Sequence, residues 1–263
     1  MIESAKTRYT DNFYFHSGDL FIGRSIQLYG EYTQLEIDIM SNFLNDRCIV
    51  YDVGGNIGYH ATAFASMAKE VHVFEPNNKN FELLERNTAH CDNAYLYNVA
   101  VSDQEGVAFV SDYDTDVPGN YGVCEMSTQG QQCRTLRLDS LNIHKPDLIK
   151  IDVEGHELAV IRGAASIIAS NKPMIFYECL HGSGFDEIYD FLTGLGYKIY
   201  WVPVTNYNPN NFYGNPVNVF GSGGVVNCLA APPQIPDLRL HRMISRDDTY
   251  LKLISRITGQ PEE

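Results

Sequence analysis

The sequence predicts an α/β protein in which helices cover both faces of one doubly wound, mostly parallel sheet. Three observations support this class. The 263 residues suffice for one large domain with appendages, and 44% apolar and 20% charged residues are ordinary for a globular protein. Short strand-like runs alternate with stretches of helical periodicity. The runs are apolar almost throughout, as in parallel strands that are buried on both faces.

The expected strands share a short apolar run that is rich in β-branched or aromatic residues. They lie at residues 49–53, 71–75, 95–101, 148–153, 174–178 and 197–202. Helices are expected where apolar residues recur every three or four positions. They lie at residues 35–44, 57–68, from 78 onward, 158–168 and 185–195.

The chain divides into three predicted regions. Residues 1–48 form an N-terminal extension with a lead-in helix, residues 49–232 form the core, and residues 233–263 form a helical tail interrupted by proline. The tail carries basic residues that we expect on one solvated helix face. They are Arg239, Arg242, Arg246, Lys252 and Arg256. Residues 205–224 are rich in asparagine and aromatic residues, and we expect either a lid or an ordinary flexible loop there.

Charge and composition exclude several partners. Nineteen basic and 33 acidic residues give a net charge of −14 without a Lys/Arg cluster, so no nucleic-acid partner is expected. No apolar run approaches the ~18 residues that cross a bilayer, and no basic-then-apolar signal opens the chain, so no membrane association is expected. The six cysteines form no CxxC pair, which is typical of a reducing compartment. We expect a cytoplasmic location.

A glycine-containing turn follows the first core strand. Residues 52–58 read DVGGNIG, and Gly54 and Gly58 allow the backbone to turn sharply toward a helix while passing close to a ligand. A dinucleotide fingerprint would need glycine in place of Val53. The turn therefore predicts a ligand site that differs from a nicotinamide cradle.

Acidic residues end the next two strands. Glu75-Pro76 ends the second strand about 20 residues after the glycine turn, where a carboxylate can accept both ribose hydroxyls of a nucleoside. Ser102-Asp103 ends the third, where an adenine amino group can bind. Because the carboxyl ends of parallel strands share one edge of the sheet, these groups predict a nucleoside site.

The fourth strand carries charges that a buried strand should not have. Lys150, Asp152 and Glu154 alternate onto one face, and Glu178 ends the fifth strand beside them. His181 lies three residues after Glu178. These residues predict a catalytic site next to the nucleoside site.

Taken together, the motifs resemble those of the FkbM family of S-adenosylmethionine-dependent methyltransferases. The matching segments are Tyr51–Tyr59, Val71–Pro76, Asn98–Gly106, Leu138–Leu141, Asp147–Glu157, 161–164 and Pro173–Glu178. The resemblance covers roughly residues 30–200. It implies the class I, Rossmann-like fold with a seven-stranded sheet, and S-adenosylmethionine as the cofactor.

The resemblance also implies positions around this cofactor. The residues expected around its methionine part are Asp52, Gly54, Asn56 and Gly58. Glu75, beside Pro76, would hold the ribose, and Ser102 or Asp103 would meet the adenine edge. Glu31 would close over the cofactor.

The implied reaction is O-methylation of a hydroxyl on a sugar, a glycan or a related polyol. Asp152 is the expected general base, Lys150 its charge partner, and Glu178 or Glu154 the group that orients the acceptor. The same carboxylates suit Mg²⁺ or Mn²⁺, and the sequence does not separate these options. His156 and His181 are the alternative polar groups at this edge.

Two other functions fit a Rossmann-like sheet. A NAD(P)-dependent reductase or epimerase is disfavoured by the missing first glycine and by the absence of Tyr-x-x-x-Lys. A non-catalytic cofactor-binding protein is disfavoured by the intact set of acidic strand ends.

Overall fold

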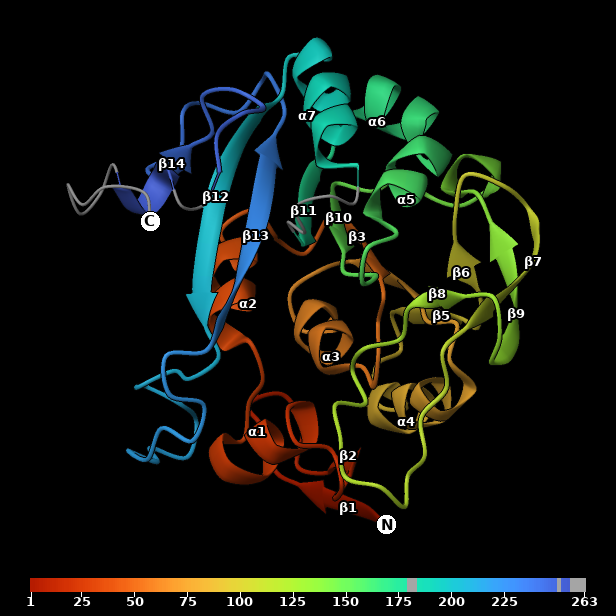
Figure 1. The fold of residues 1–263 in the computed structure, drawn as a ribbon, viewed down its shortest axis with the longest axis vertical. Coiled ribbons are helices and arrows are strands. Elements are labelled where there is room, and N and C mark those ends of the chain that lie inside the picture. Colours follow the sequence, from red (N-terminus) through yellow and green to blue (C-terminus); the bar gives the residue numbers. More distant parts are fainter. Residues whose placement is uncertain (179–183, 250–251, 256–263) are drawn as a thin grey trace.

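The structure is a computed structural model that describes residues 1–178, 184–249 and 252–255. Within these residues the main sheet has eight strands in the order β14-β12-β13-β11-β10-β3-β4-β5 (Figure 1). Their bounds are β3 (Ile49–Val53), β4 (Glu70–Phe74), β5 (Ala94–Tyr97), β10 (Leu148–Ile151), β11 (Met174–Glu178), β12 (Lys198–Thr205), β13 (Gly224–Ala231) and β14 (His241–Arg242). The predicted α/β class is confirmed.

The sheet is mixed. Strands β5, β4, β3, β10 and β11 run parallel to one another. Strand β13 is antiparallel to both of its neighbours, β11 and β12. The expected count of seven is wrong, because His241 and Arg242 pair with Trp201 and Tyr200 as an eighth strand. The expected tail helix is therefore wrong at Arg242. Within the described part of the tail residues 252–255 are helical, and Arg256 lies outside the described residues.

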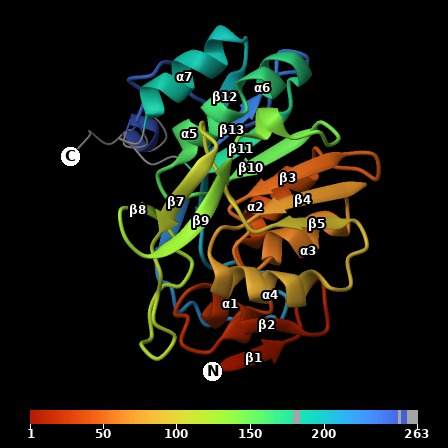
Figure 2. The same ribbon diagram turned by 90° about the vertical axis from the view of Figure 1, so that its right-hand side faces the viewer.

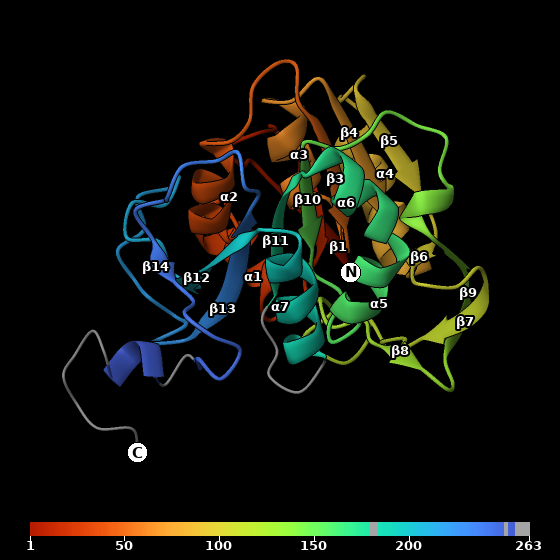
Figure 3. The ribbon, with the colours of Figure 1, turned by 90° about the horizontal axis from the view of Figure 1, so that it is seen from above.

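Helices cover both faces of the sheet (Figure 3). Their bounds are α1 (Ile22–Tyr29), α2 (Gln34–Ser41), α3 (Tyr59–Ala65), α4 (Asn78–Thr88), α5 (Glu157–Gly163), α6 (Ala165–Asn171) and α7 (Phe185–Gly194). Helices α5, α6 and α7 pack on one face, and α2, α3 and α4 pack on the other. The single helix expected over 158–168 is two helices, because Ala164 leaves the helical conformation at φ −111° and ψ 8°. No described helix is both long and apolar enough to span a bilayer.

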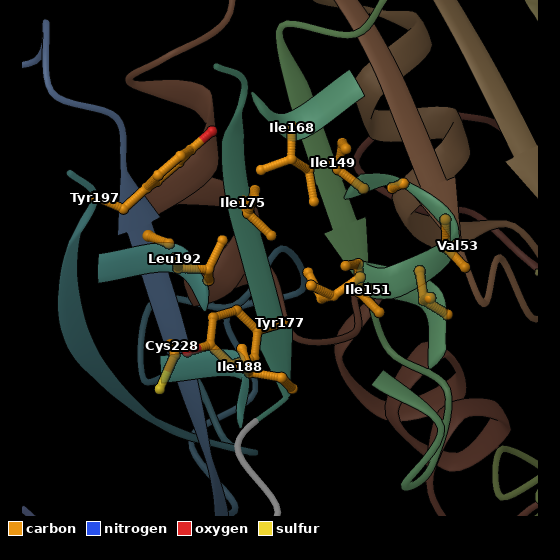
Figure 4. Packing of buried hydrophobic residues seen from close by; sticks show 14 of the residues in the cluster. Val53, Ile149, Ile151, Ile168, Ile175, Tyr177, Ile188, Leu192, Tyr197 and Cys228 are labelled. Atoms are coloured by element: carbon orange, nitrogen blue, oxygen red, sulfur yellow. The ribbon is translucent and has the colours of Figure 1, made fainter. Parts of the chain in front are cut away.

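The core consists of strand residues that alternate between these two helical layers. Figure 4 shows the layer beneath α6 and α7, where Ile149, Ile151, Ile175 and Tyr177 are almost completely buried. Each fully buried side chain of this size contributes about 1.5–3 kcal/mol to folding. The intervening residues face α2, α3 and α4, and at the carboxyl ends of the strands they are polar.

A second sheet, which the sequence analysis did not predict, follows β5. Its order is β6-β9-β7-β8, with bounds β6 (Ala100–Val101), β7 (Gly106–Val110), β8 (Met126–Ser127) and β9 (Gln131–Leu136), and η1 (Leu138–Ser140) follows it (Figure 2). The strand expected over 95–101 is therefore wrong, because it splits between two sheets. Asn98 interrupts it and donates its side-chain amide to the carbonyl of Glu75 at 3.0 Å.

The N-terminal extension and the 206–223 loop lie together. The hairpin of β1 (Ile2–Ala5) and β2 (Phe13–His16) precedes α1, and the loop that joins β12 to β13 runs beside α1 (Figure 1). The Tyr29 hydroxyl donates to the Val217 carbonyl at 2.8 Å and accepts from the Val219 amide at 3.0 Å. The loop is thus docked, and the strand β13 that follows it was missed by the sequence analysis.

Candidate active site

A cavity of about 350 Å³ lies at the carboxyl ends of β3, β4, β10 and β11. It is walled by the turn after β3, by the first turns of α2 and α3, and by both ends of the 206–223 loop. The sequence-predicted residues that line it are Gly54, Asn56, Glu75, Pro76, Lys150, Asp152, Glu154 and Glu178. The structure therefore brings the predicted nucleoside and catalytic groups into one cavity.

The turn after β3 depends on its first glycine. Gly54 has φ +82°, and a Cβ atom there would lie 1.8 Å from the carbonyl oxygen of Asp152. Glycine thus allows the ends of β3 and β10 to approach closely. Gly58, at φ +93°, begins α3 and packs against Leu84, but it does not line the cavity. Gly58 therefore has a structural role in the turn, and its expected contact with the cofactor stays a prediction.

Glu75 is 3% exposed and joins two turns. Its carboxylate accepts one hydrogen bond from the amide of Asn56 and one from the amide of Asn77, both at 2.8 Å. Burial raises the pKa of Glu75 to about 7. Each carboxylate oxygen keeps a second lone pair that can accept a hydrogen bond from a ligand hydroxyl.

Asp52 and Lys150 form a buried pair beneath the cavity. The Lys150 ammonium lies 3.1 Å from Asp52 Oδ1 and 3.4 Å from Asp152 Oδ2, and it donates to the Gly54 carbonyl at 2.8 Å. Burial opposes the charged form, but the charges of Asp52 and Asp152 prevail and raise the pKa of Lys150. Asp52 is fully buried and does not line the cavity, so its expected contact with the methionine part of the cofactor stays a prediction.

Three carboxylates meet at the cavity wall. Oxygens of Asp152, Glu154 and Glu178 lie within 4.8 Å of one another. The Asp152 side chain is 45% exposed and lies beside Lys150. Strand β10 ends at Ile151, so Glu154 reaches the group through a turn, with φ +51°, and not along the strand as expected.

Two of these carboxylates bind protons near neutral pH. Burial, followed by repulsion from Asp152, raises the pKa of Glu154 to about 7 and that of Glu178 to about 8. Glu178 Oε2 is buried, and no described residue forms a hydrogen bond with it. A general base is most effective when its pKa lies near the working pH, and an arrangement of three carboxylates also offers oxygen ligands to a divalent cation.

Besides Asp52 and Gly58, three further predicted cofactor contacts lie outside the cavity. Glu31 is 2% exposed, and its carboxylate accepts from the guanidinium of Arg8 at 2.6 Å, the side chain of Asn208 at 2.7 Å and the amide of Phe212 at 2.9 Å. Ser102 and Asp103 follow β6 in the small sheet. Ser102 is close to the cavity through His156, which lines it and whose Nε2 lies 3.0 Å from Ser102 Oγ. His181 lies outside the described residues.

The sequence analysis missed a polar group on the part of the cavity wall that α2, α3 and β13 form. His60 of α3, Glu36 of α2 and Asn227 of β13 all line the cavity and are nearly buried. Tyr32 and Phe220 line the same side. Because Glu36 and His60 lie within helices, the search along strand ends could not find them.

The cavity is strongly acidic. Five carboxylates line it, and the described lining residues include no arginine and only one lysine, which is already paired. The carboxylates are Glu36, Glu75, Asp152, Glu154 and Glu178. Such a site favours a ligand with a cationic centre, offers a carboxylate for a ribose diol, and can take up a proton.

Comparison with known proteins agrees with this geometry. The sequence model of the family described as "Methyltransferase FkbM domain" matches residues 52–199. The hexuronic acid methyltransferase AglP of Haloferax volcanii is 32% identical over 130 residues, which are 46% of this chain and 52% of that protein. The chain thus spans about half the length of this curated relative.

The comparison with solved structures matches methyltransferases at low identity. A methyltransferase FkbM from Methylobacillus flagellatus is 16% identical, with a TM-score of 0.48 over 71% of this chain and 44% of that one. A precorrin-6y C5,15-methyltransferase from Geobacter metallireducens is 15% identical, with a TM-score of 0.48 over 76% of this chain and 88% of that one.

Proposed function

The chain belongs to the FkbM methyltransferase family, and we propose that it transfers the methyl group of S-adenosylmethionine to a hydroxyl of a sugar or glycan. The observation that carries this proposal is that Gly54, Glu75 and the three carboxylates share one cavity. The relative that acts on a hexuronic acid supports a carbohydrate acceptor. Family membership gives no support to the nicotinamide-dependent alternative.

The cavity residues fit this cofactor. Glu75 would accept hydrogen bonds from the ribose hydroxyls, with Pro76 beside it, while Gly54 and Asn56 would lie at the methionine part, where no side chain fills the space at position 54. When bound, S-adenosylmethionine supplies a sulfonium-bound methyl group to the acceptor oxygen. The carboxylates of the cavity match the positive charge of that sulfonium.

We propose that the three-carboxylate group of Asp152, Glu154 and Glu178 accepts the proton that the acceptor hydroxyl loses. Asp152 is the base that the sequence favours, but it already faces Lys150. Glu178 has an oxygen without a hydrogen-bond partner among the described residues and a pKa of about 8. Glu178 is therefore our first choice for the base, with Asp152 and Glu154 orienting the acceptor.

A divalent cation is the second candidate for activating the hydroxyl. The carboxylate oxygens of Asp152, Glu154 and Glu178 lie close enough together to hold one. Mg²⁺ and Mn²⁺ prefer such oxygen donors. In that case methyl transfer disappears with EDTA and returns with added Mg²⁺ or Mn²⁺. With a carboxylate base, EDTA has no effect.

An uncharged acceptor group fits the cavity better than a carboxylate does. Among the described lining residues there is no arginine and the one lysine is already paired, so the carboxylate of a uronic acid would meet no free cation there. We therefore expect the product to be a methyl ether and not a methyl ester. An ether survives mild alkali, whereas an ester is hydrolysed.

The test combines binding and turnover. The purified protein is incubated with isotope-labelled S-adenosylmethionine and a panel of neutral glycosides, amino glycosides and glucuronides, and the products are located by mass spectrometry and NMR. We expect labelled ethers on neutral or amino sugars. Transfer confined to uronic acid carboxyl groups, or binding of cofactor without transfer to any acceptor, would contradict the proposal.

A further inference from the structure

Three buried side chains form a network on the part of the cavity wall that α2, α3 and β13 form. His60 Nε2 lies 3.5 Å from Glu36 Oε2 and 3.4 Å from Thr33 Oγ1, while Glu36 Oε1 accepts a hydrogen bond from Asn227 Nδ2 at 3.0 Å. His60, Glu36 and Asn227 are 6%, 5% and 4% exposed. Because all three line the cavity, this network faces ligand and not bulk solvent.

The neighbours of His60 orient its two ring nitrogens. A carboxylate accepts hydrogen bonds and donates none, so the proton of the neutral ring belongs on Nε2, beside Glu36. No described residue forms a hydrogen bond with Nδ1. The lone pair of Nδ1 is thus available to a hydroxyl of a ligand, and Glu36 acts as the residue that positions the ring.

The network adjoins the three-carboxylate group. Asn227 of β13 is the direct cross-strand partner of Glu178 of β11, and directly paired residues place their side chains on the same face of a sheet. The charge of Glu36 also contributes to the raised pKa of Glu178. Glu178 is therefore the neighbour, on the same face of the sheet, of the residue that connects to His60 through Glu36.

We propose that His60 binds a second hydroxyl of the acceptor, adjacent to the hydroxyl that is methylated. The acceptor therefore presents a vicinal diol, with one hydroxyl at the three-carboxylate group and its neighbour at His60 Nδ1. This inference rests on the proposed function and adds the feature of the sugar that the cavity selects. A site built to bind a hydroxyl discriminates against an analogue that lacks it.

The experiment compares a methylated glycoside with its monodeoxy analogues. Once NMR has located the methyl ether, the analogues that lack each adjacent hydroxyl are assayed with the wild type and with His60→Phe. In the wild type we expect one adjacent deoxy analogue to lose about tenfold in kcat/KM, as one hydrogen bond warrants. The ratio of kcat/KM for the parent glycoside to kcat/KM for this deoxy analogue measures the discrimination. In His60→Phe we expect this ratio to fall toward one, mainly because KM for the parent glycoside rises.

Further variants separate recognition from folding. Glu36→Gln removes the charge that orients the ring, and we expect it to reduce the same ratio. His60→Asn, which keeps a short polar side chain, should retain part of it. His72→Phe is the matched control, because His72 is 4% exposed on β4 but does not line the cavity. Calorimetry with S-adenosylhomocysteine checks that each variant still binds cofactor.

The possible failures are distinct. Unchanged deoxy discrimination in His60→Phe, or full activity of the wild type on every adjacent deoxy analogue, would overturn the role of His60 while leaving methyl transfer intact. Absence of methyl transfer to every glycoside would instead overturn the proposed function.

Discussion

Glu75 shows how a single buried carboxylate can serve both the fold and a ligand. We expect Glu75→Gln to weaken S-adenosylmethionine binding by about 1–1.5 kcal/mol, because a hydrogen bond to a charged group becomes a weaker, neutral one. Titration calorimetry measures this change. Glu82→Gln, on the exposed face of α4, is the control and should bind normally. Equal affinity in a folded Glu75→Gln protein would remove Glu75 from the cofactor site.

The carboxylate that takes the proton can be identified from a pH profile. With Glu178 as the proposed base, its deprotonated form is the active one, so kcat/KM of the wild type should rise with pH and level off above a pH of about 8. Asp152 raises the pKa of Glu178, so Asp152→Asn should move this rise to lower pH. A loss of turnover by ~10²–10⁴-fold at every pH would instead identify Asp152 as the base.

At the level of single residues, the sequence could predict those groups that directly follow an apolar strand. Gly54, Glu75 and Glu178 were found in this way, because a polar residue after a buried run has few purely structural explanations. Asp52 has the same pattern, yet it is buried against Lys150. Only the three-dimensional arrangement distinguishes a counter-ion beneath the cavity from a ligand contact within it.

Among the elements, the 206–223 loop depends most on one side chain. Glu31 holds Arg8, Asn208 and the Phe212 amide at once, so Glu31→Gln leaves buried donors poorly paired. We expect a loss of about 1–3 kcal/mol in stability and a higher KM for the acceptor, because Asn206 and Phe220 at the loop ends line the cavity.

Hydrogen exchange of residues 206–223, together with acceptor KM, checks this expectation. Asp11→Asn is the control, because Asp11 forms only an exposed ion pair with Lys6. Faster exchange in Glu31→Gln without any change in acceptor KM would show that the loop does not shape the acceptor side.

The elements that the sequence predicted well are those that are buried on both faces. The bounds of β3 and β11 match the expected segments, because continuous apolar runs mark both. The small sheet was missed because β7 leaves Val107 62% and Phe109 39% exposed, so its pattern lacks a clear buried face. The buried strand β13 was missed because its glycine-rich approach resembles the preceding loop.

For the whole molecule, the raised carboxyl pKa values make stability depend on pH. Glu178 has a pKa of about 8 when folded, against 4.5 for the free side chain, so the folded state holds a proton that the unfolded state releases. Its contribution to stability is complete below a pH of about 4.5 and is lost as pH rises toward 8. Glu75 and Glu154, with values of about 7, act in the same direction.

We therefore expect the Tm of the free protein to fall between pH 5 and 8 more steeply than that of Glu178→Gln, which cannot ionise. Differential scanning calorimetry at several pH values measures both slopes. The exposed control Glu85→Gln should follow the wild type. Parallel slopes for the wild type and Glu178→Gln would show that Glu178 titrates normally.

The docking of the loop onto the N-terminal residues has a consequence for synthesis of the chain. Lys6, Leu28 and Glu31 are synthesised long before their hydrogen-bond partners Tyr213, Asn215 and Asn208, which follow 207, 187 and 177 residues later. Contacts between such distant segments form slowly, because a long chain must first be brought together. The parallel strands of the nascent protein are thus synthesised before residues 206–223, and the cavity is complete only when that loop has docked.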